Sequence, residues 1–150
     1  STFVTRVLVV SGASMNPTLN NGDTVAISSL KRSFDYGDIV IVAQPNAMHK
    51  TLIKRVIAVG GDTVDIDFYK GTVSVNGQVL DEPYVNAPVH DRENFEGKIT
   101  VPKGSVFVMG DNRNASTDSR DARLGCVDTR YIMGRVYFTL FPVKNIGVVK

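Results

Sequence analysis

The chain has 150 residues, the size of one domain, and hydrophobic residues make up 43% of it, enough to build a core. Its 17 basic and 15 acidic side chains are scattered and leave a formal net charge of +2, which excludes a basic nucleic-acid stripe and an acidic tail. Cys126 is the only cysteine, so an intrachain disulfide is excluded, and the two histidines lie far apart without ligand-like neighbours. We therefore expect no metal, no cofactor and no nucleic-acid partner.

No stretch of the sequence approaches the roughly 20 apolar residues that span a bilayer. The pattern of a signal peptide, a basic segment followed by an apolar core and a cleavage site, is also missing. The chain begins with Ser1 rather than Met, so we expect an N-terminus that has been processed or trimmed.

Short runs rich in β-branched residues, separated by Gly, Asn, Asp and Pro, dominate the sequence and are typical of strands. In chain order, the expected strands are Phe3–Val10, Thr24–Ser28, Ile39–Val42, Thr51–Val59, Thr63–Phe68, Thr72–Val75, Ser105–Met109 and Gly134–Leu140. Their regular spacing favours an all-β fold of antiparallel sheets, a sandwich or a barrel.

The turns between these strands are less uniform. Asn76-Gly77 is typical of a hairpin, because both turn residues need positive φ, and Tyr69-Lys70-Gly71 indicates a turn just before it. Residues 81–98 are poor in strand signal and are expected to form a loop-rich excursion. Asp128–Met133 makes at best a short helical turn.

Chemistry is concentrated in three segments, of which Ser11–Leu19 is the first. Small residues flank Ser14, so a peptide backbone can approach its hydroxyl closely. Pro17 ends any continued strand and fixes the local path of the chain. Taken alone, the segment is more simply interpreted as hydroxyls that cap a loop.

The second segment, residues 52–62, contains a lysine among aliphatic residues. Because strand side chains alternate between faces, Lys54 shares its face with Leu52 and Val56, and Arg55 points the other way. Such a lysine either snorkels to the surface or is held in an apolar site. The third segment, Met109–Arg120, is dense in short hydrogen-bonding side chains and, taken alone, indicates a solvated loop rich in Asx turns.

Together these segments resemble, in order and content, the sequence boxes of the type I signal peptidases, a Ser-Lys protease family that removes secretory signal peptides. The matching boxes are Ser14-Met15-Asn16-Pro17-Thr18-Leu19, Gly37-Asp38-Ile39-Val40, Ile53-Lys54-Arg55 with Gly60-Gly61-Asp62, and Gly110-Asp111-Asn112-Arg113 through Ser119-Arg120 with Gly134-Arg135-Val136. The resemblance covers about residues 8 to 141.

The resemblance implies a catalytic site in an apolar groove between antiparallel sheets. It implies one catalytic domain, with a core at about residues 1–66 and 100–150 and a hairpin-containing insertion at about 67–99. It also implies a transmembrane anchor before Ser1, outside this chain, and a catalytic domain on the extracytoplasmic side of the cell membrane. Gly12 and the absence of a cysteine pair resemble the Gram-positive members.

The resemblance also assigns catalytic roles. Ser14 would attack the scissile carbonyl and form an acyl-enzyme, with Lys54 as the general base. A lysine accepts a proton only when neutral, so burial would have to lower its pKa from the usual value of about 10.4, with no carboxylate beside the amine. Ser116 aligns with a serine that orients the lysine. The residues that align with charge-pairing supports of this loop are Asp111, Arg113, Asp118 and Arg120.

The backbone N–H of Ser14 would contribute to the oxyanion hole. Some family members place a serine two residues before the nucleophile as a second donor, but Gly12 stands there, so the second donor stays open. The residues expected to bind substrate are Val10, Met15, Leu19, Leu52 and Ile53. For Leu19 and Leu52 a purely structural role in the core is an equal alternative.

Substrates of the family are signal peptides that end in an Ala-x-Ala-like sequence. We expect the strands Phe3–Val10 and Ile39–Val42 to flank an extended substrate, which would pair by adding a strand. Met15, Leu19 and Ile53 would wall pockets for the first and third residues before the cut. The apolar residues Phe3, Val4 and Val7 are expected close to a phospholipid surface.

Three alternatives remain. A self-cleaving repressor-type Ser-Lys protease would carry a DNA-binding domain and an internal cleavage loop, and neither is found in this sequence. A catalytically silent β-domain that binds secretory proteins or cell-wall components would lack Ser14, Lys54 or Ser116, but all three are present. A mitochondrial inner-membrane relative, also a Ser-Lys protease, stays open.

Overall fold

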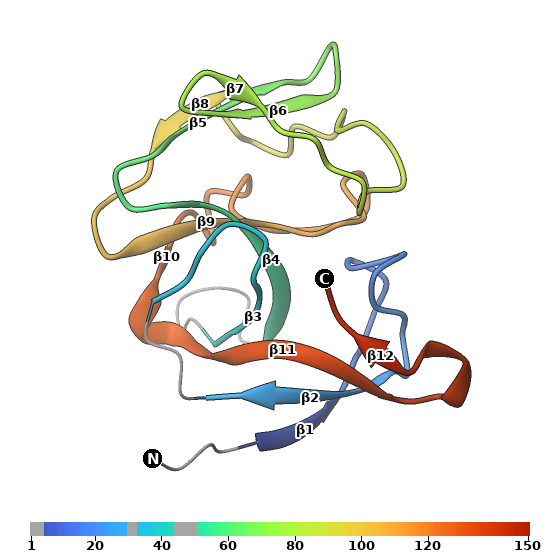
Figure 1. The fold of residues 1–150 in the computed structure, drawn as a ribbon. Coiled ribbons are helices and arrows are strands. Elements are labelled where there is room, and N and C mark those ends of the chain that lie inside the picture. The colour runs from blue at the N-terminus through green and yellow to red at the C-terminus, as the bar shows by residue number, and fades with distance from the viewer. Residues whose placement is uncertain (1–4, 30–32, 44–50) are drawn as a thin grey trace.

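The structure is a computed structural model and describes residues 5–29, 33–43 and 51–150 (Figure 1). Antiparallel strands and two short 3₁₀ helices make up its regular elements, which confirms the expected all-β class. The strands are β1 (Thr5–Val9), β2 (Thr24–Ser28), β3 (Ile39–Val42), β4 (Leu52–Val59), β5 (Thr63–Asp67), β6 (Thr72–Val75), β7 (Gln78–Val79), β8 (Lys98–Thr100), β9 (Ser105–Met109), β10 (Val127–Asp128), β11 (Ile132–Phe141) and β12 (Gly147–Val148). The 3₁₀ helices are η1 (Thr129–Tyr131) and η2 (Val143–Asn145).

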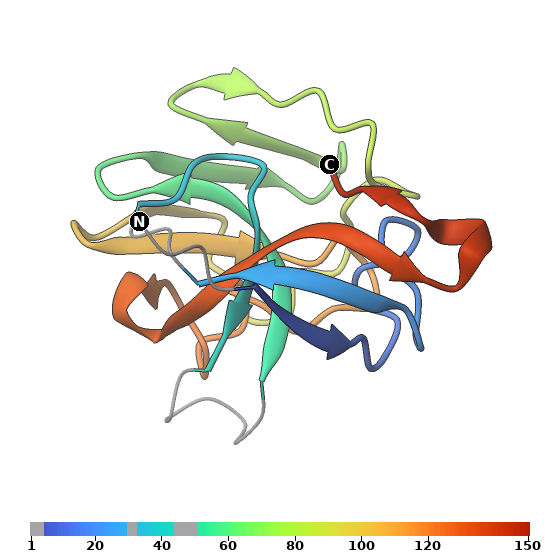
Figure 2. The ribbon, with the colours of Figure 1, turned by 60° about the horizontal axis from the view of Figure 1, so that its bottom comes forward.

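A large sheet in the order β1-β2-β11-β3-β4-β9-β10 forms the main body, with β12 paired to β11. The sheet curls, and β1 and β2 lie across the body from β9, the last strand but one in the order (Figures 1 and 2). Among the described residues, the outer edge of β1 has no strand partner. The curl gives the sheet a concave side, where side chains from distant strands can meet.

The central strand β3 is apolar on both faces because both faces are covered. All four residues of β3 are buried. Val40 and Val42 pack in one core cluster with Leu52 and Val56, and the alternate residues of β3 pack in a second cluster with Met15 and Leu19. The alternation of strand side chains thus divides β3 between two cores.

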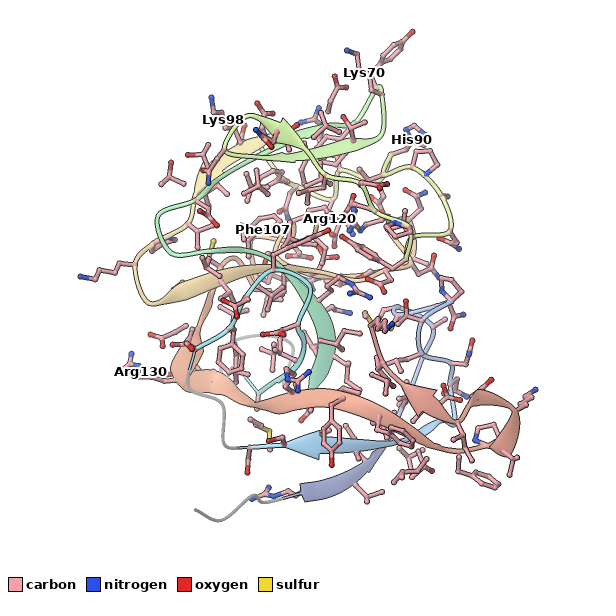
Figure 3. All side chains as sticks on the ribbon, in the orientation of Figure 1. Lys70, His90, Lys98, Phe107, Arg120 and Arg130 are labelled. Carbon is pink, nitrogen blue, oxygen red and sulfur yellow. The ribbon has the colours of Figure 1, made fainter. Side chains whose placement is uncertain are left out.

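The small sheet has the order β7-β6-β5-β8, spans residues 63–100 and packs beside β9. A third core cluster joins the two sheets, and Phe107 of β9 lies in it between them (Figure 3). The expected hairpin is present, with Asn76 at φ 52° and Gly77 at φ 81°. Whether residues 67–99 are an insertion in the family fold stays a prediction.

The excursion at residues 81–97 has no strand, as expected, yet it is fastened to the sheets. Val89 and Phe95 are buried in the core cluster beside Phe107. Glu93 Oε2 lies 3.2 Å from Arg120 Nε, close enough for an ion pair although no hydrogen bond reaches that oxygen. Burial, followed by the charge of Asp118, raises the pKa of the Glu93 carboxyl to about 8.

The sequence predicts every strand of four or more residues and misses the strands of two or three residues. Four expected strands have the observed bounds: Thr24–Ser28, Ile39–Val42, Thr72–Val75 and Ser105–Met109. The unpredicted strands β7, β8, β10 and β12 have two or three residues each, too few to show an alternating pattern. The expected helical turn is η1. Phe3 and Val4 lie outside the described residues.

Candidate active site

A cleft of about 540 Å³ opens at the β1 end of the large sheet. Its walls are residues 8–15, residues 51–54, Ala115 and Thr117. Two backbone edges that have no strand partner among the described residues border it. The first belongs to β1, the last strand of the sheet, and the second to the start of β4, because β9 pairs with β4 only from Arg55 onward. The cleft therefore has the form of a groove into which an extended peptide can insert.

Ser14 and Lys54 meet in this groove. The Lys54 amine donates a hydrogen bond of 2.8 Å to Ser14 Oγ, although the two residues are 40 positions apart. Lys54 is only 3% exposed and stands on β4 between Leu52 and Val56, as the alternation of the strand predicts. The amine is thus held in an apolar site rather than snorkelling into water.

The turn that carries Ser14 is held by the loop after β9. The backbone N–H of Asn112 donates to the Ser14 carbonyl over 2.9 Å, and the Asn112 side chain donates to the Ala13 carbonyl over 3.1 Å. The backbone N–H of Asp111 contacts the sulfur of Met15 at 3.5 Å. Sequence reasoning missed Asn112, because nothing distinguishes its amide from others in a loop rich in such residues.

Gly110 packs against both the turn that carries Ser14 and the side chain of Ser116. A Cβ on Gly110 would lie 2.2 Å from Ser116 Oγ and 2.6 Å from the Ser14 carbonyl oxygen, far inside van der Waals contact. Only glycine therefore fits at this position. Ser14 and Ser116 therefore both pack against the space that a side chain at Gly110 would fill.

Ser116 donates its hydroxyl proton to Asp118 Oδ2 over 2.9 Å, which leaves its oxygen lone pairs to accept a further hydrogen bond. Asp118 is completely buried and receives two hydrogen bonds of 2.8 Å from the Arg120 guanidinium. Arg120 extends between the two sheets (Figure 3). Burial alone would raise the pKa of Asp118, but Arg120, the Gly110 N–H and the Lys54 charge hold that pKa below its usual range.

A lowered pKa for the Lys54 amine requires that no carboxylate stands beside it. The structure meets this requirement only in part. Asp118 is near enough to feel the lysine charge, and its own charge is balanced by Arg120. Asp118 and Arg120, both expected to support this loop through charge pairs, pair with each other. Whether Ser116 also bonds the Lys54 amine stays a prediction.

The other two predicted charge-pairing residues have partners that the sequence did not indicate. Asp111 pairs with Arg55, the neighbour of Lys54, through bonds of 2.8 and 2.7 Å, and also accepts a hydrogen bond from the Thr18 hydroxyl. Arg113 pairs with Glu82 of the loop-rich excursion. Asp111 therefore ties together all three segments that the sequence singled out.

The candidate oxyanion donors differ in availability. The Gly12 N–H donates to the Asn21 side chain over 2.9 Å and is occupied by that bond. For the Ser14 N–H we find no acceptor within the part of the chain that the structure describes. The structure therefore does not support the Gly12 N–H as the second oxyanion donor, and the Ser14 N–H remains the candidate donor.

Four of the five expected substrate-binding residues line the groove: Val10, Met15, Leu52 and Ile53. Leu19 does not; it is completely buried in a core cluster, so the structural alternative holds for it. The expectation that Ile39–Val42 flanks the substrate is wrong, because β3 is paired on both sides, with β4 and β11. The start of β4 borders the groove instead.

Comparisons with known proteins agree with this geometry. The model of the family "Signal peptidase, peptidase S26" matches residues 1–141. Signal peptidase I of Bacillus licheniformis is 35% identical, over 96% of this chain and 81% of its own length. Signal peptidase IB of Staphylococcus aureus is also 35% identical, over 95% of this chain and 81% of its own length.

A solved structure shares the fold. The crystal structure of a signal peptidase I from Enterococcus faecalis superposes with a TM-score of 0.56 and 28% sequence identity, covering 69% of this chain and 96% of that one. Identity and coverage at these levels extend well beyond the catalytic boxes. The chain belongs to the signal peptidase family, peptidase S26, and is a signal peptidase I, a hydrolase that removes signal peptides.

Proposed function

We propose that this enzyme cleaves signal peptides with a Ser-Lys dyad formed by Ser14 and Lys54. The observation that carries the proposal is the 2.8 Å contact between the Lys54 amine and Ser14 Oγ inside an apolar groove. In the reaction the direction of this hydrogen bond is reversed, so that the Ser14 hydroxyl donates and the Lys54 amine accepts. A neutral Lys54 accepts the hydroxyl proton while Ser14 Oγ bonds to the scissile carbonyl carbon.

In the rest of the cycle, the protons that Lys54 accepts pass to the leaving amine and back to Ser14. The tetrahedral intermediate collapses, its C–N bond breaks, and the Lys54 ammonium protonates the leaving amine. Lys54 then takes a proton from water, whose oxygen attacks the ester carbonyl carbon. The C–O bond to Ser14 breaks, the Lys54 ammonium returns the proton to Ser14 Oγ, and the signal peptide leaves with its new carboxyl end. The Ser14 N–H stabilises the oxyanion in both halves, a contribution of about 3 kcal/mol per donor.

The groove favours small side chains at alternate positions of the substrate. An extended peptide between the β1 edge and the start of β4 sends its first and third residues before the cut to the same side. Met15 and Ile53 line the groove and, in this proposal, wall the two subsites so that only small side chains fit there. We infer a preference for Ala-x-Ala sequences.

We further infer that the catalytic domain rests on a membrane surface, on the extracytoplasmic side where signal peptides emerge. Across the large sheet, exposed Val9 is in register with Thr24, and Thr24 with exposed Phe141. Both apolar side chains are about 60% exposed, and Val9 also borders the groove. Other exposed apolar residues of β1 and of the chain after Thr139 are Val7, Leu140, Val143, Ile146 and Val148.

We call this set of residues the apolar rim. It lies on β1 and the β11–β12 end, away from the small sheet (Figure 1). A large apolar patch is unfavourable in water and favourable at a lipid interface. No helix in the described ranges is long and apolar enough to cross a bilayer.

Replacing either member of the dyad removes activity. We expect Ser14→Ala and Lys54→Ala each to lower kcat/KM for a preprotein by at least about a thousandfold, because the two groups act as a unit. Ser116→Ala should lower the rate less, since its hydroxyl would position the amine and makes no bond to substrate. Lys103→Ala, at an exposed lysine, is the matched control. The thermal unfolding transition should remain cooperative throughout. Substantial turnover by purified Ser14→Ala or Lys54→Ala would disprove the dyad.

Peptides that vary the first and third residues before the cut test the pocket model. Leu or Lys in place of either alanine should lower kcat/KM about tenfold or more, because crowding a packed wall costs about 1–3 kcal/mol. Ile53→Ala should partly restore cleavage of the leucine peptides by widening the groove. Equal cleavage of all peptides by the unaltered enzyme would refute the pocket model.

Phospholipid vesicles test the apolar rim. The double variant Phe141→Asp/Val143→Asp should bind vesicles at least about tenfold more weakly, since burying one such side chain contributes about 1.5–3 kcal/mol. Tyr69→Asp is the control, because Tyr69 is 93% exposed but belongs to the turn before β6. Equal vesicle binding by both variants would remove the membrane claim and leave the dyad untouched.

A further inference from the structure

Glu82 provides the counter-ion for an arginine buried beneath the catalytic loop. The Arg113 guanidinium is 1% exposed and donates two hydrogen bonds to the Glu82 carboxylate, of 2.9 and 2.5 Å. A buried charge that loses its partner is strongly unfavourable. Glu82 belongs to the loop-rich excursion, 31 positions before Arg113. The excursion thus reaches into the support of the active site.

Tyr84 joins this arginine to the strand of the catalytic lysine. Its ring lies 3.8 Å from the guanidinium carbon of Arg55 and 5.9 Å from that of Arg113, within the range of cation–π attraction. The Tyr84 hydroxyl donates to Glu82 Oε2 over 2.6 Å and lies 2.8 Å from the Tyr36 hydroxyl. Burial, followed by the Glu82 carboxylate, raises the pKa of the Tyr84 phenol, so the hydroxyl remains a donor.

A continuous path of contacts leads from this pair to the nucleophile. Arg113 Nε donates to the Gly110 carbonyl over 3.1 Å. Gly110 in turn is so close to Ser14 and Ser116 that no Cβ fits there. Two residues further on, the Asn112 N–H donates a hydrogen bond to the Ser14 carbonyl. Any shift of Arg113 therefore moves the turn against which Ser14 is packed.

We propose that Glu82 and Tyr84 are positioning residues for signal-peptide hydrolysis, acting through Arg113 and Arg55 on the turn at residues 110–113. The proposal rests on the proposed Ser14–Lys54 chemistry. Neither Glu82 nor Tyr84 lines the groove, so neither contacts the substrate directly, and their substitution should act on the position of Ser14 more than on substrate binding. Their loss should then lower kcat and leave KM nearly constant. A displacement of about 1 Å at the reacting atoms can lower the rate about a hundredfold.

The test compares five variants with the unaltered enzyme on one peptide substrate. Glu82→Ala should lower kcat about ten- to a hundredfold with KM within about twofold. Glu82→Gln keeps one oxygen acceptor and the side-chain volume, so it should retain more activity and fold even if Glu82→Ala does not. Tyr84→Leu removes the ring and should lose more activity than Tyr84→Phe, which keeps it. Asp81→Ala, at the exposed neighbouring acid, should match the unaltered enzyme.

Amide hydrogen exchange supplies a readout that does not need substrate. The Asn112 amide, bonded to the Ser14 carbonyl, and the Gly110 amide, bonded to Asp118, should exchange at least about tenfold faster in Glu82→Gln than in Asp81→Ala. The amides of β3 should be unchanged. Faster exchange throughout the molecule would show a purely structural role and overturn the proposal.

The two failures are distinguishable. If the unaltered enzyme cleaves but Glu82→Gln and Tyr84→Leu match it in kcat and in exchange at residues 110–112, the positioning role is wrong and the dyad stands. A rise in KM with constant kcat would also overturn it. If the unaltered enzyme cleaves no signal peptide, the proposed function fails, and exchange alone decides whether Glu82 holds the turn.

Discussion

The proposed Ser14–Lys54 pair depends on a close contact that leaves no room for a side chain at Gly110. The Ser14 carbonyl and the Ser116 hydroxyl both lie where a Cβ on this residue would stand. Because folded interiors are close-packed, the nucleophile turn, the loop after β9 and the start of β4 must keep one arrangement. That arrangement sets the 2.8 Å separation of the Lys54 amine from Ser14 Oγ. A proton can pass across that distance without a shift of the backbone.

Buried charges enforce this arrangement from outside the groove. Asp111 with Arg55, Asp118 with Arg120, and Glu82 with Arg113 each place a carboxylate against a nearly inaccessible guanidinium. Such pairs add little net stability compared with apolar residues, but breaking one leaves a buried charge unpaired. They therefore penalise alternative positions of the loop. In this account, the pairs select one geometry for the reaction rather than strengthen the fold.

The sequence could predict what is local and periodic. Runs of β-branched residues located strands such as Ser105–Met109. The alternation of side chains along β4 also predicted that Lys54 shares a face with Leu52 and Val56. The meeting of Ser14 with Lys54 came from resemblance to a family, since no local pattern links residues 40 positions apart. Glu82 and Asn112 were missed because their roles depend on the path of a loop without periodicity. The sequence left the role of Leu19 open between groove wall and core, because both use the same apolar side chains.

The most direct test of this account adds a single methyl group at the central contact. Gly110→Ala would place a Cβ 2.2 Å from Ser116 Oγ and 2.6 Å from the Ser14 carbonyl oxygen, so one of the two serines must move. The account predicts that kcat/KM for a signal-peptide substrate falls by at least about a hundredfold, while the variant still unfolds in one cooperative transition. Cleavage within a few-fold of the unaltered enzyme would contradict it, because the catalytic geometry would then not depend on this contact.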